Sequence, residues 1–318
     1  MTNDVVVFSG QAHPEFAREM CDLLDVDLSP ARVQRFSNDC LQVQLRANCR
    51  QRDVYIVQPV APPTQENLME LLMMVDAARG ASASQVNVVM PHYAYARSDK
   101  KDAPRISLGG RLVADLLATA GATRVLTMTL HAEQVHGFFS MPVDHLTALP
   151  VLAEHFRGRD LSNTVVVSPD FGNAKAANRF ARALGVEVAA GSKRRLADDT
   201  VVIDAIVGDV QGKDCIVLDD EIATGGSTMT LIDCIRRYDA QGVSVVCTHG
   251  LFTGNAVETF NARDDIDEIV TTNTVPQDKP IDRLVSLSVA PLFAEAVRRI
   301  HLGESVSTLF SEENTYGA

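Results

Sequence analysis

The chain has 318 residues, 46% of them hydrophobic, and a formal net charge of −12. A chain of this length fills two ordinary cores better than one, so we expect two domains. The acidic balance argues against partners such as nucleic acid or anionic lipid, because both require a basic surface. The six cysteines are widely spaced, and the sequence shows neither a signal peptide nor a membrane span. We therefore expect reduced thiols and a cytoplasmic protein with no membrane partner.

Short strands rich in β-branched residues alternate with amphipathic helices along the chain. The expected strands are Val5–Phe8, Val54–Val57, Val86–Met90, Val125–Thr129, Thr164–Val167, Cys215–Leu218, Val243–Cys247 and Ile269–Thr272. The expected helices are Asn67–Ala78, whose Leu and Met stripe suits core or subunit packing, Leu108–Ala120, Ala174–Leu184, Met229–Tyr238 and Pro291–His301. This alternation indicates an α/β fold with mainly parallel sheets flanked by helices.

The two halves of the chain resemble each other. Val5–Ser9, Asp53–Val57 and Val86–His92 have counterparts about 160 residues later, in the same order. Three matches in one order favour a duplicated α/β domain over chance similarity between valine-rich strands. We expect domains at 1–145 and 146–318, with the last helix packing on either half.

An apolar strand ending in paired carboxylates, followed by a Gly-Gly turn and a helix, predicts a phosphate site. Glycines let backbone amides approach an anion, and the helix N-terminus and hydroxyl groups add donors. Asp219 and Asp220 are placed to accept hydrogen bonds from sugar hydroxyls or to face a divalent metal. The alternative is an ordinary acidic loop and turn. The expected phosphate ligands are Thr224, Gly225, Gly226, Ser227 and Thr228.

This loop resembles the ribose-phosphate signature of the phosphoribosyltransferase family, which implies two tandem phosphoribosyltransferase-like domains here. Met90–Lys101 and Leu130–Phe139 resemble a more specific family, the ribose-phosphate pyrophosphokinases. Further segments that resemble this family are Phe8–Gly10, Phe36–Asn38, Asn67–Leu72, Val167–Asp170, Lys193–Arg195, Val207–Val210 and Glu304–Phe310. The resemblance covers essentially the whole chain.

The resemblance implies transfer of the β,γ-diphosphoryl group of ATP to the anomeric hydroxyl of ribose 5-phosphate, giving phosphoribosyl pyrophosphate and AMP. It assigns the ribose 5-phosphate to the Thr224–Thr228 loop, with Asp219 and Asp220 on the ribose hydroxyls. It assigns the C-terminal domain to this sugar and the N-terminal domain to the nucleotide. The implied ATP-binding residues are Phe36, Asn38, Arg97, Ser98 and His131.

The resemblance also implies magnesium, positioned with the nucleotide phosphates by His131 and Asp170. Each has a structural alternative, because a histidine after a strand is often only hydrogen-bonded and an aspartate is a common helix N-cap. Lys193 and Arg195 match a catalytic loop whose cations neutralise the transferred group, the alternative being a solvated basic turn.

The remaining implications concern assembly and regulation. The resemblance implies a homo-hexamer or another homo-oligomer, in which the adenine-binding hairpin acts across a subunit interface. It also implies a regulatory site for inorganic phosphate, as an activator, or ADP at Ser305, Ser307 and Thr308.

The sequence departs from the family pattern around the nucleotide. Cys40 stands where the family usually has an acid, Ser98 where it has glutamine, and Thr129 and Ala223 where it has aspartate. Three alternatives stay open: altered nucleotide preference, a weakly active or inactive regulatory subunit assembling with a paralogue, and a phosphoribosyltransferase acting on a base. The fused halves and the Arg97 motif argue against the last of these.

Overall fold

The computed structural model describes residues 4–197 and 200–309, without the side chains of 193–204 and 308. The chain divides into two compact units. Unit 1 contains the described residues up to Thr147, Thr274–Pro276 and those from Val289 onward. Unit 2 contains the described residues of Ala148–Asn273 together with Gln277–Ser288. The main division falls between β8 and α4, near the expected boundary, while the chain returns to unit 1 for its last helix.

Unit 1 is built on a six-stranded parallel sheet with the order β2-β1-β5-β6-β7-β8. Its strands are β1 Val5–Ser9, β2 Leu28–Ser29, β5 Asp53–Val57, β6 Gln85–Met90, β7 Arg124–Met128 and β8 Val143–Leu146. A separate antiparallel hairpin joins β3 Ala31–Arg35 to β4 Leu41–Leu45. The central strands are buried almost throughout, as expected for a parallel sheet covered on both faces.

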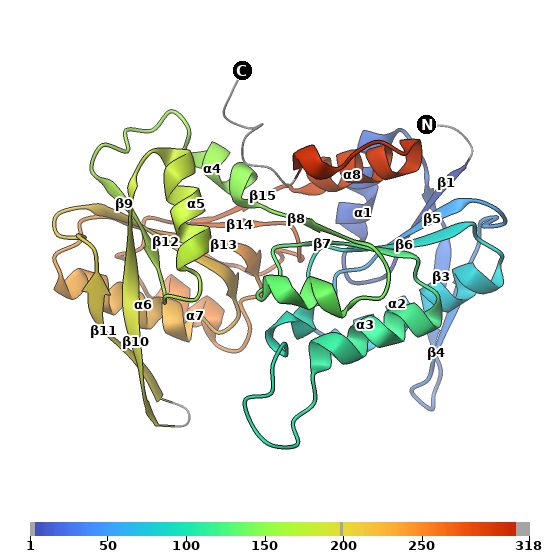
Figure 1. Ribbon diagram of the computed structural model, residues 1–318, viewed down its shortest axis with the longest axis horizontal. Coiled ribbons are helices and arrows are strands. Elements are labelled where there is room, and N and C mark those ends of the chain that lie inside the picture. Colours follow the sequence, from blue (N-terminus) through green and yellow to red (C-terminus); the bar gives the residue numbers. More distant parts are fainter. Residues whose placement is uncertain (1–3, 198–199, 310–318) are drawn as a thin grey trace. The chain divides into compact units, whose positions relative to one another are not determined.

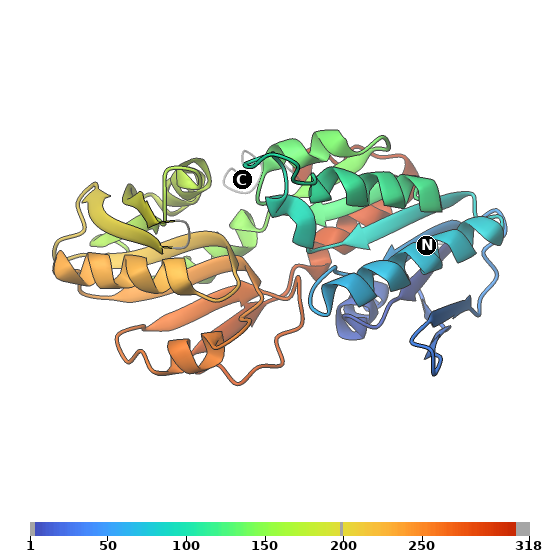
Figure 2. The same ribbon diagram turned by 90° about the horizontal axis from the view of Figure 1, so that it is seen from below.

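Helices cover both faces of this sheet (Figure 1). The helices are α1 Pro14–Leu24, α2 Thr64–Gly80, α3 Gly109–Ala120 and α8 Ala290–Leu302, with short 3₁₀ turns η1 Ala94–Arg97, η2 Glu133–Phe138 and η3 Ser307–Leu309. On one face α8 packs on α1, where the rings of Phe16 and Phe293 meet edge to face at 5.6 Å. The last helix therefore belongs to the N-terminal unit. On the other face, α2 and α3 lie side by side (Figure 2), and α2 buries Leu71, Met74 and Val75 in the core.

Unit 2 repeats this plan with a seven-stranded sheet ordered β11-β10-β9-β12-β13-β14-β15. Its strands are β9 Thr164–Ser168, β10 Glu187–Ala197, β11 Thr200–Val207, β12 Asp214–Ile222, β13 Val243–Gly250, β14 Glu268–Thr272 and β15 Leu284–Leu287. Its helices are α4 Leu149–Phe156, α5 Ala174–Leu184, α6 Gly226–Arg237 and α7 Ala256–Asn261. Only the β10–β11 pair is antiparallel among the described strands of this sheet.

The strand orders of the two units correspond. The two sheets have the same strand order, apart from the additional edge strand β11 in unit 2. The corresponding strands are β1 and β9, β2 and β10, β5 and β12, β6 and β13, β7 and β14, and β8 and β15. This agreement supports the duplication expected from the sequence and confirms the predicted α/β class with two mainly parallel sheets. No helix in the described part of the chain is long and apolar enough to cross a membrane.

Candidate functional site

The predicted phosphate loop lies at the carboxyl end of β12 and leads directly into α6. β12 continues to Ile222, so Asp219 and Asp220 lie within the strand, beyond its expected end at Leu218. Thr253 donates its backbone N–H to the carbonyl of Ala223 at 2.8 Å, which braces the loop. The first amides of a helix have no intrahelical carbonyl to bind, so the start of α6 presents donors suited to an anion.

The five predicted phosphate ligands form this turn. Thr224, Gly226 and Ser227 are exposed, while Gly225 and Thr228 are buried. Gly225 has a left-handed backbone (φ 78°), and a Cβ there would lie 2.6 Å from the ring of Phe260. The Thr228 hydroxyl is buried without a hydrogen-bond partner among the described residues. A buried hydroxyl left unpaired costs free energy, so a ligand that supplies a partner is favoured.

The carboxylates of Asp219 and Asp220 lie beside this loop. Asp219 Oδ1 accepts the backbone N–H of Asp220 at 2.9 Å. Asp219 pairs with Cys247 on the neighbouring strand β13. Burial, together with both carboxylates, raises the pKa of the Cys247 thiol to about 12, so this cysteine stays protonated and unreactive.

Asp170 lies in the loop after β9, the strand adjacent to β12. Its Oδ1 accepts the backbone N–H groups of Gly172 at 2.9 Å and Asn173 at 3.2 Å. The Asn173 side chain donates to the carbonyl of Leu218 at 3.0 Å and so ties the Asp170 loop to β12. Sequence reasoning missed Asn173, whose position just before a helix was the available signal. Asp170 is therefore not the N-cap of α5, which is Asn173; its carboxylate instead bonds backbone N–H groups of the loop that precedes the helix.

Lys193 and Arg195 lie on β10, where their backbones pair with Ile203 and Val201 of β11. The side chains of both basic residues are outside the described part of the chain. The β10–β11 hairpin replaces the expected basic loop with an extended two-stranded segment (Figure 1).

In unit 1, Arg97 and His131 follow the adjacent strands β6 and β7, and both are exposed. The loop before His131 is braced by His145 of β8, whose Nε2 accepts the backbone N–H of Leu130 at 2.9 Å. Burial lowers the pKa of His145, which favours the neutral ring that can accept this bond. His145 was also missed, because a histidine in an expected linker gives no sequence signal.

Ser98 is held against the start of α3. Its Oγ accepts the backbone N–H of Gly109 at 2.8 Å, and its carbonyl accepts that of Gly110 at 3.1 Å. A Cβ on Gly109 would lie 2.9 Å from the ring of Tyr95, so glycine permits this close approach. The structure therefore gives Ser98 a positioning role beside its predicted nucleotide contact.

Phe36 and Asn38 lie at the tip of the β3–β4 hairpin. The Phe36 side chain is 43% exposed, which leaves its ring accessible for stacking. Asn38 Oδ1 accepts the backbone N–H of Cys40 at 3.2 Å, and the Cys40 thiol is exposed. Arg35 forms ion pairs with Asp39 and with Glu66 of α2.

The predicted regulatory residues follow α8. The Ser305 Oγ lies 3.1 Å from the Ser307 Oγ and accepts the backbone N–H of Ser307 at 3.2 Å. Arg299 donates to the Ser305 carbonyl at 3.0 Å, and both serines are exposed. The Thr308 side chain lies outside the described part.

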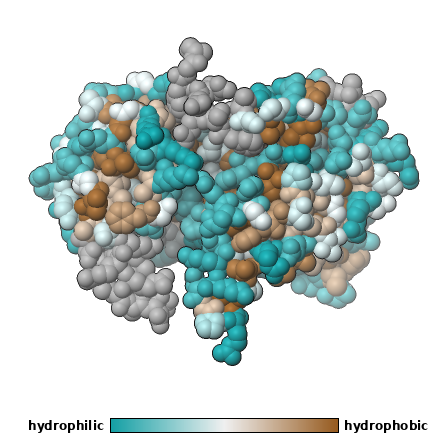
Figure 3. Space-filling view, in the orientation of Figure 1, coloured by the Kyte–Doolittle hydropathy of each residue, from teal (hydrophilic) through white to brown (hydrophobic). Residues whose placement is uncertain are grey.

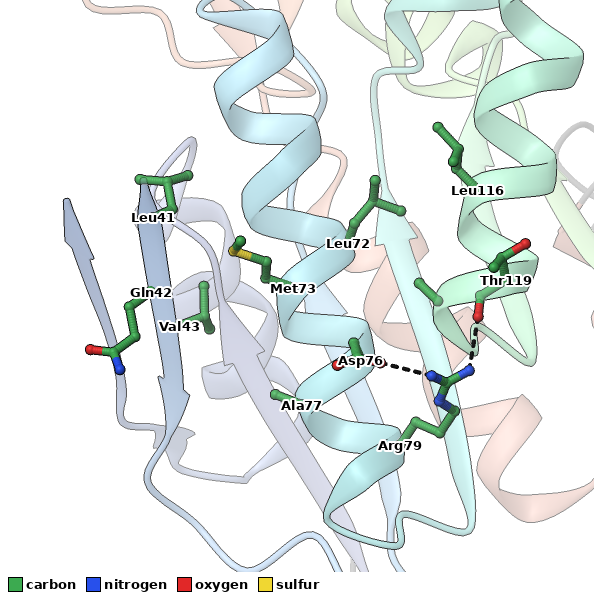
Figure 4. Close-up of a pocket in the computed structure, with 11 residues that line it drawn as sticks. Leu41, Gln42, Val43, Leu72, Met73, Asp76, Ala77, Arg79, Leu116 and Thr119 are labelled. Carbon is green, nitrogen blue, oxygen red and sulfur yellow. Dashed lines mark hydrogen bonds and ion pairs between the residues drawn. The ribbon is translucent and has the colours of Figure 1, made fainter. Parts of the chain in front are cut away.

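A groove of about 570 Å³ lies elsewhere on unit 1, between β4, α2 and α3. Figure 4 shows Leu41, Val43, Met73 and Leu116 around it, with Arg79 bonded to Asp76. Apolar side chains also gather on the surface over α3 (Figure 3), where Leu112 and Leu116 are exposed. None of the predicted substrate ligands lines this groove.

Comparison with known proteins gives consistent matches. Residues 5–121 match the N-terminal domain of ribose phosphate pyrophosphokinase, and residues 196–311 match the phosphoribosyl synthetase-associated domain. A Streptomyces coelicolor protein provisionally named ribose-phosphate pyrophosphokinase is 63% identical over 309 residues, 96% of this chain and 98% of that protein. The ribose-phosphate pyrophosphokinase of Deinococcus radiodurans is 49% identical over 315 residues, with the same coverage of both chains. A crystal structure of phosphoribosylpyrophosphate synthetase from Mycobacterium smegmatis superposes with a TM-score of 0.89 at 36% identity, covering 95% of this chain and all of that one.

Proposed function

Because this chain belongs to the ribose-phosphate pyrophosphokinase family and has that enzymatic activity, we propose that its two units divide the substrates. Unit 2 binds ribose 5-phosphate and unit 1 binds ATP. The observation that carries this division is the turn between β12 and α6, where exposed Thr224 and Ser227 accompany the buried Thr228 hydroxyl, which has no hydrogen-bond partner within the described part of the chain. A phosphate at this turn would accept hydrogen bonds from the helix amides and the hydroxyl groups.

The sugar hydroxyls are assigned to the carboxylates of Asp219 and Asp220. A carboxylate accepts hydrogen bonds from neighbouring hydroxyls, and the strand β12 holds both residues next to the phosphate turn. This orients the anomeric oxygen for attack on the β-phosphorus of ATP. The anomeric hydroxyl releases its proton to solvent as its oxygen bonds to the β-phosphorus, and the bond from the β-phosphorus to the oxygen that leaves with AMP breaks.

The nucleotide is assigned to Phe36, Asn38, Arg97, Ser98 and His131. The accessible ring of Phe36 supports stacking on a base, and the guanidinium of Arg97 suits phosphate oxygens. Lys193 and Arg195 remain the proposed catalytic cations, because phosphoryl-type transfer depends on stabilising the charge of the moving group.

Magnesium fits part of the predicted metal set. Among the described residues, no group of three His, Cys, Asp or Glu side chains forms a metal cage, and magnesium is usually held through one or two carboxylates plus substrate phosphates. The carboxylate of Asp170 supplies a hard oxygen of the kind that magnesium prefers. The imidazole of His131 is a poorer ligand for magnesium, and it is better suited to hydrogen-bond phosphate oxygens. The ion would neutralise charge on the diphosphoryl group. We therefore propose Asp170 as the metal ligand and His131 as a nucleotide ligand.

A homo-oligomer, cytoplasmic location and phosphate activation through Ser305, Ser307 and Thr308 stay predictions. The oligomer and the phosphate activation rest on the family resemblance, and the location rests on the sequence pattern described above.

The division of substrates is tested by steady-state kinetics with each substrate varied in turn. Ser227→Ala should raise the KM for ribose 5-phosphate about tenfold, since it removes a hydrogen bond to a charged group, and leave the KM for ATP nearly unchanged. Phe36→Ala should raise the KM for ATP and leave the KM for ribose 5-phosphate nearly unchanged. Equal effects of each variant on both constants would contradict the division.

A further inference from the structure

Two segments of unit 1 carry the proposed ligands of the nucleotide phosphates, and both ligands, Arg97 and His131, are exposed. One includes Arg97 and follows β6, and the other includes His131 and follows β7. The strands are neighbours in the sheet, with Met90 opposite Thr127. A side-chain hydrogen bond joins the two segments just beyond these ligands: Gln134 Nε2 donates to Asp99 Oδ2 at 2.6 Å.

Each end of this bond is anchored differently. The Asp99 segment is fixed to α3, because its neighbour Ser98 bonds the N–H groups of Gly109 and Gly110. Tyr93 strengthens the same attachment by donating its hydroxyl to the Gly110 carbonyl at 2.5 Å. Burial raises the pKa of this tyrosine, so its hydroxyl keeps the donated proton.

Gln134 belongs to η2, which starts two residues after His131 and buries Val135 in the core of unit 1. The Val135 backbone N–H bonds the Ala132 carbonyl at 3.0 Å and closes the turn. The core therefore holds η2 in place on the Gln134 side of the bond between Gln134 and Asp99. On the other side, residues 101–107 are exposed and form a long connection between the Asp99 segment and α3 (Figure 1).

We propose that Asp99 and Gln134 are positioning residues that hold the Arg97 segment at a fixed distance from the His131 segment. This inference rests on the proposed assignment of ATP to unit 1. Two groups that bind one triphosphate act together only if their spacing matches the ligand, and pre-organised spacing reduces the entropy lost on binding. Without the bond, the Arg97 segment keeps its attachment to α3 and to the core through the buried Ala96, but it loses the direct side-chain link to the His131 segment that Asp99 and Gln134 supply.

The test reverses the polarity of the hydrogen bond. Gln134→Glu places two carboxylates together and should weaken ATP binding about tenfold. Asp99→Asn keeps an oxygen that accepts the Gln134 hydrogen bond, so it should weaken ATP binding less than Gln134→Glu does. The double variant Asp99→Asn with Gln134→Glu restores a bond in which the asparagine amide donates to the glutamate, so it should recover most of the lost affinity.

Equilibrium titration with ATP and magnesium gives the affinities without requiring turnover, and steady-state kinetics add the KM for each substrate. The expected result is a raised KM for ATP in Gln134→Glu, an unchanged KM for ribose 5-phosphate, and rescue in the double variant. Additive losses in the double variant, or unaltered ATP binding in Gln134→Glu, would overturn the positioning role. ATP binding that is unaffected by Arg97→Ala and His131→Ala would instead overturn the proposed nucleotide site.

Discussion

Gly225 lies directly against Phe260, so that a Cβ on this glycine would be 2.6 Å from Cε2 of the ring. The ring is fully buried and meets Phe252 edge to face at 5.6 Å, which leaves it little room to move. The backbone of the phosphate turn can therefore take its position only with glycine at 225. The positive φ of 78° imposes the same requirement.

Gly225→Ala should destabilise the protein by about 1–3 kcal/mol and raise the KM for ribose 5-phosphate, because relief of the clash displaces the turn. Urea unfolding and steady-state kinetics measure the two effects. Gly80→Ala is the matched control: Gly80 lies in α2 with no atom within 4 Å of the added Cβ. It should be neutral or slightly stabilising. Equal stability of the two variants would contradict the steric account.

Thr228→Val should separate stability from binding. The Thr228 hydroxyl is buried without a partner among the described residues, so removing it should raise the free energy of unfolding by about 1 kcal/mol without ligand. The same change removes a proposed donor to the sugar phosphate and should weaken ribose 5-phosphate binding. Unfolding and calorimetric titration on the same samples test both. A variant that is less stable yet binds normally would show that the hydroxyl is satisfied within the protein.

Cys40→Glu should strengthen discrimination in favour of ATP. The thiol is exposed at the hairpin tip, close in sequence to Phe36 and Asn38, and the family usually has an acid at this position. A carboxylate accepts hydrogen bonds from an adenine amino group, which guanine lacks at that position. Competition between ATP and GTP measures the ratio of kcat/KM values. Identical ratios before and after the substitution would remove Cys40 as a determinant of donor choice.

Glu295 should contribute to stability only above acidic pH. The guanidinium of Arg298, and then that of Arg299, lowers its pKa to about 2. Because the folded pKa lies below the unfolded value of about 4.3, the contribution is present above that value and is lost as pH falls towards 2. The side chain is one-third exposed, so the effect should be below about 1 kcal/mol. Urea unfolding of Glu295→Gln should show a flatter stability profile than the parent protein between pH 4.5 and 2, roughly the window between these pKa values. Glu154→Gln provides the control, because Glu154 forms a similar but more exposed ion pair with Arg157.

The central strands and helices were predictable because their side chains are buried in a simple periodic pattern. Val54–Val57 became β5 and Ala174–Leu184 became α5 at the expected positions. The strand expected at Val125–Thr129 ends one residue earlier, at Met128, because Thr129 has a left-handed backbone (φ 43°). The hairpin β3–β4 was not predicted as two strands, since its partly exposed residues lack a continuous apolar run.

The candidate site was predictable where chemistry is concentrated in one segment. The turn from Thr224 to Thr228 carries its own signal in glycines, hydroxyls and neighbouring acids. The supporting contacts were not predictable, since Asn173 to Leu218 and Gln134 to Asp99 join residues far apart in the sequence. Such pairs depend on which strands become neighbours, and strand order is a property of the folded sheet.

The most direct test of the account is phosphorus NMR of the purified protein with ribose 5-phosphate, ATP, magnesium and inorganic phosphate. The account predicts phosphoribosyl pyrophosphate and AMP in equal amounts. It also predicts a rate lower by about 10³–10⁵ in a folded Lys193→Ala/Arg195→Ala variant, by analogy with the loss of an arginine finger. Absence of both products with the parent protein, or an undiminished rate in the double variant, would contradict the assigned catalytic machinery.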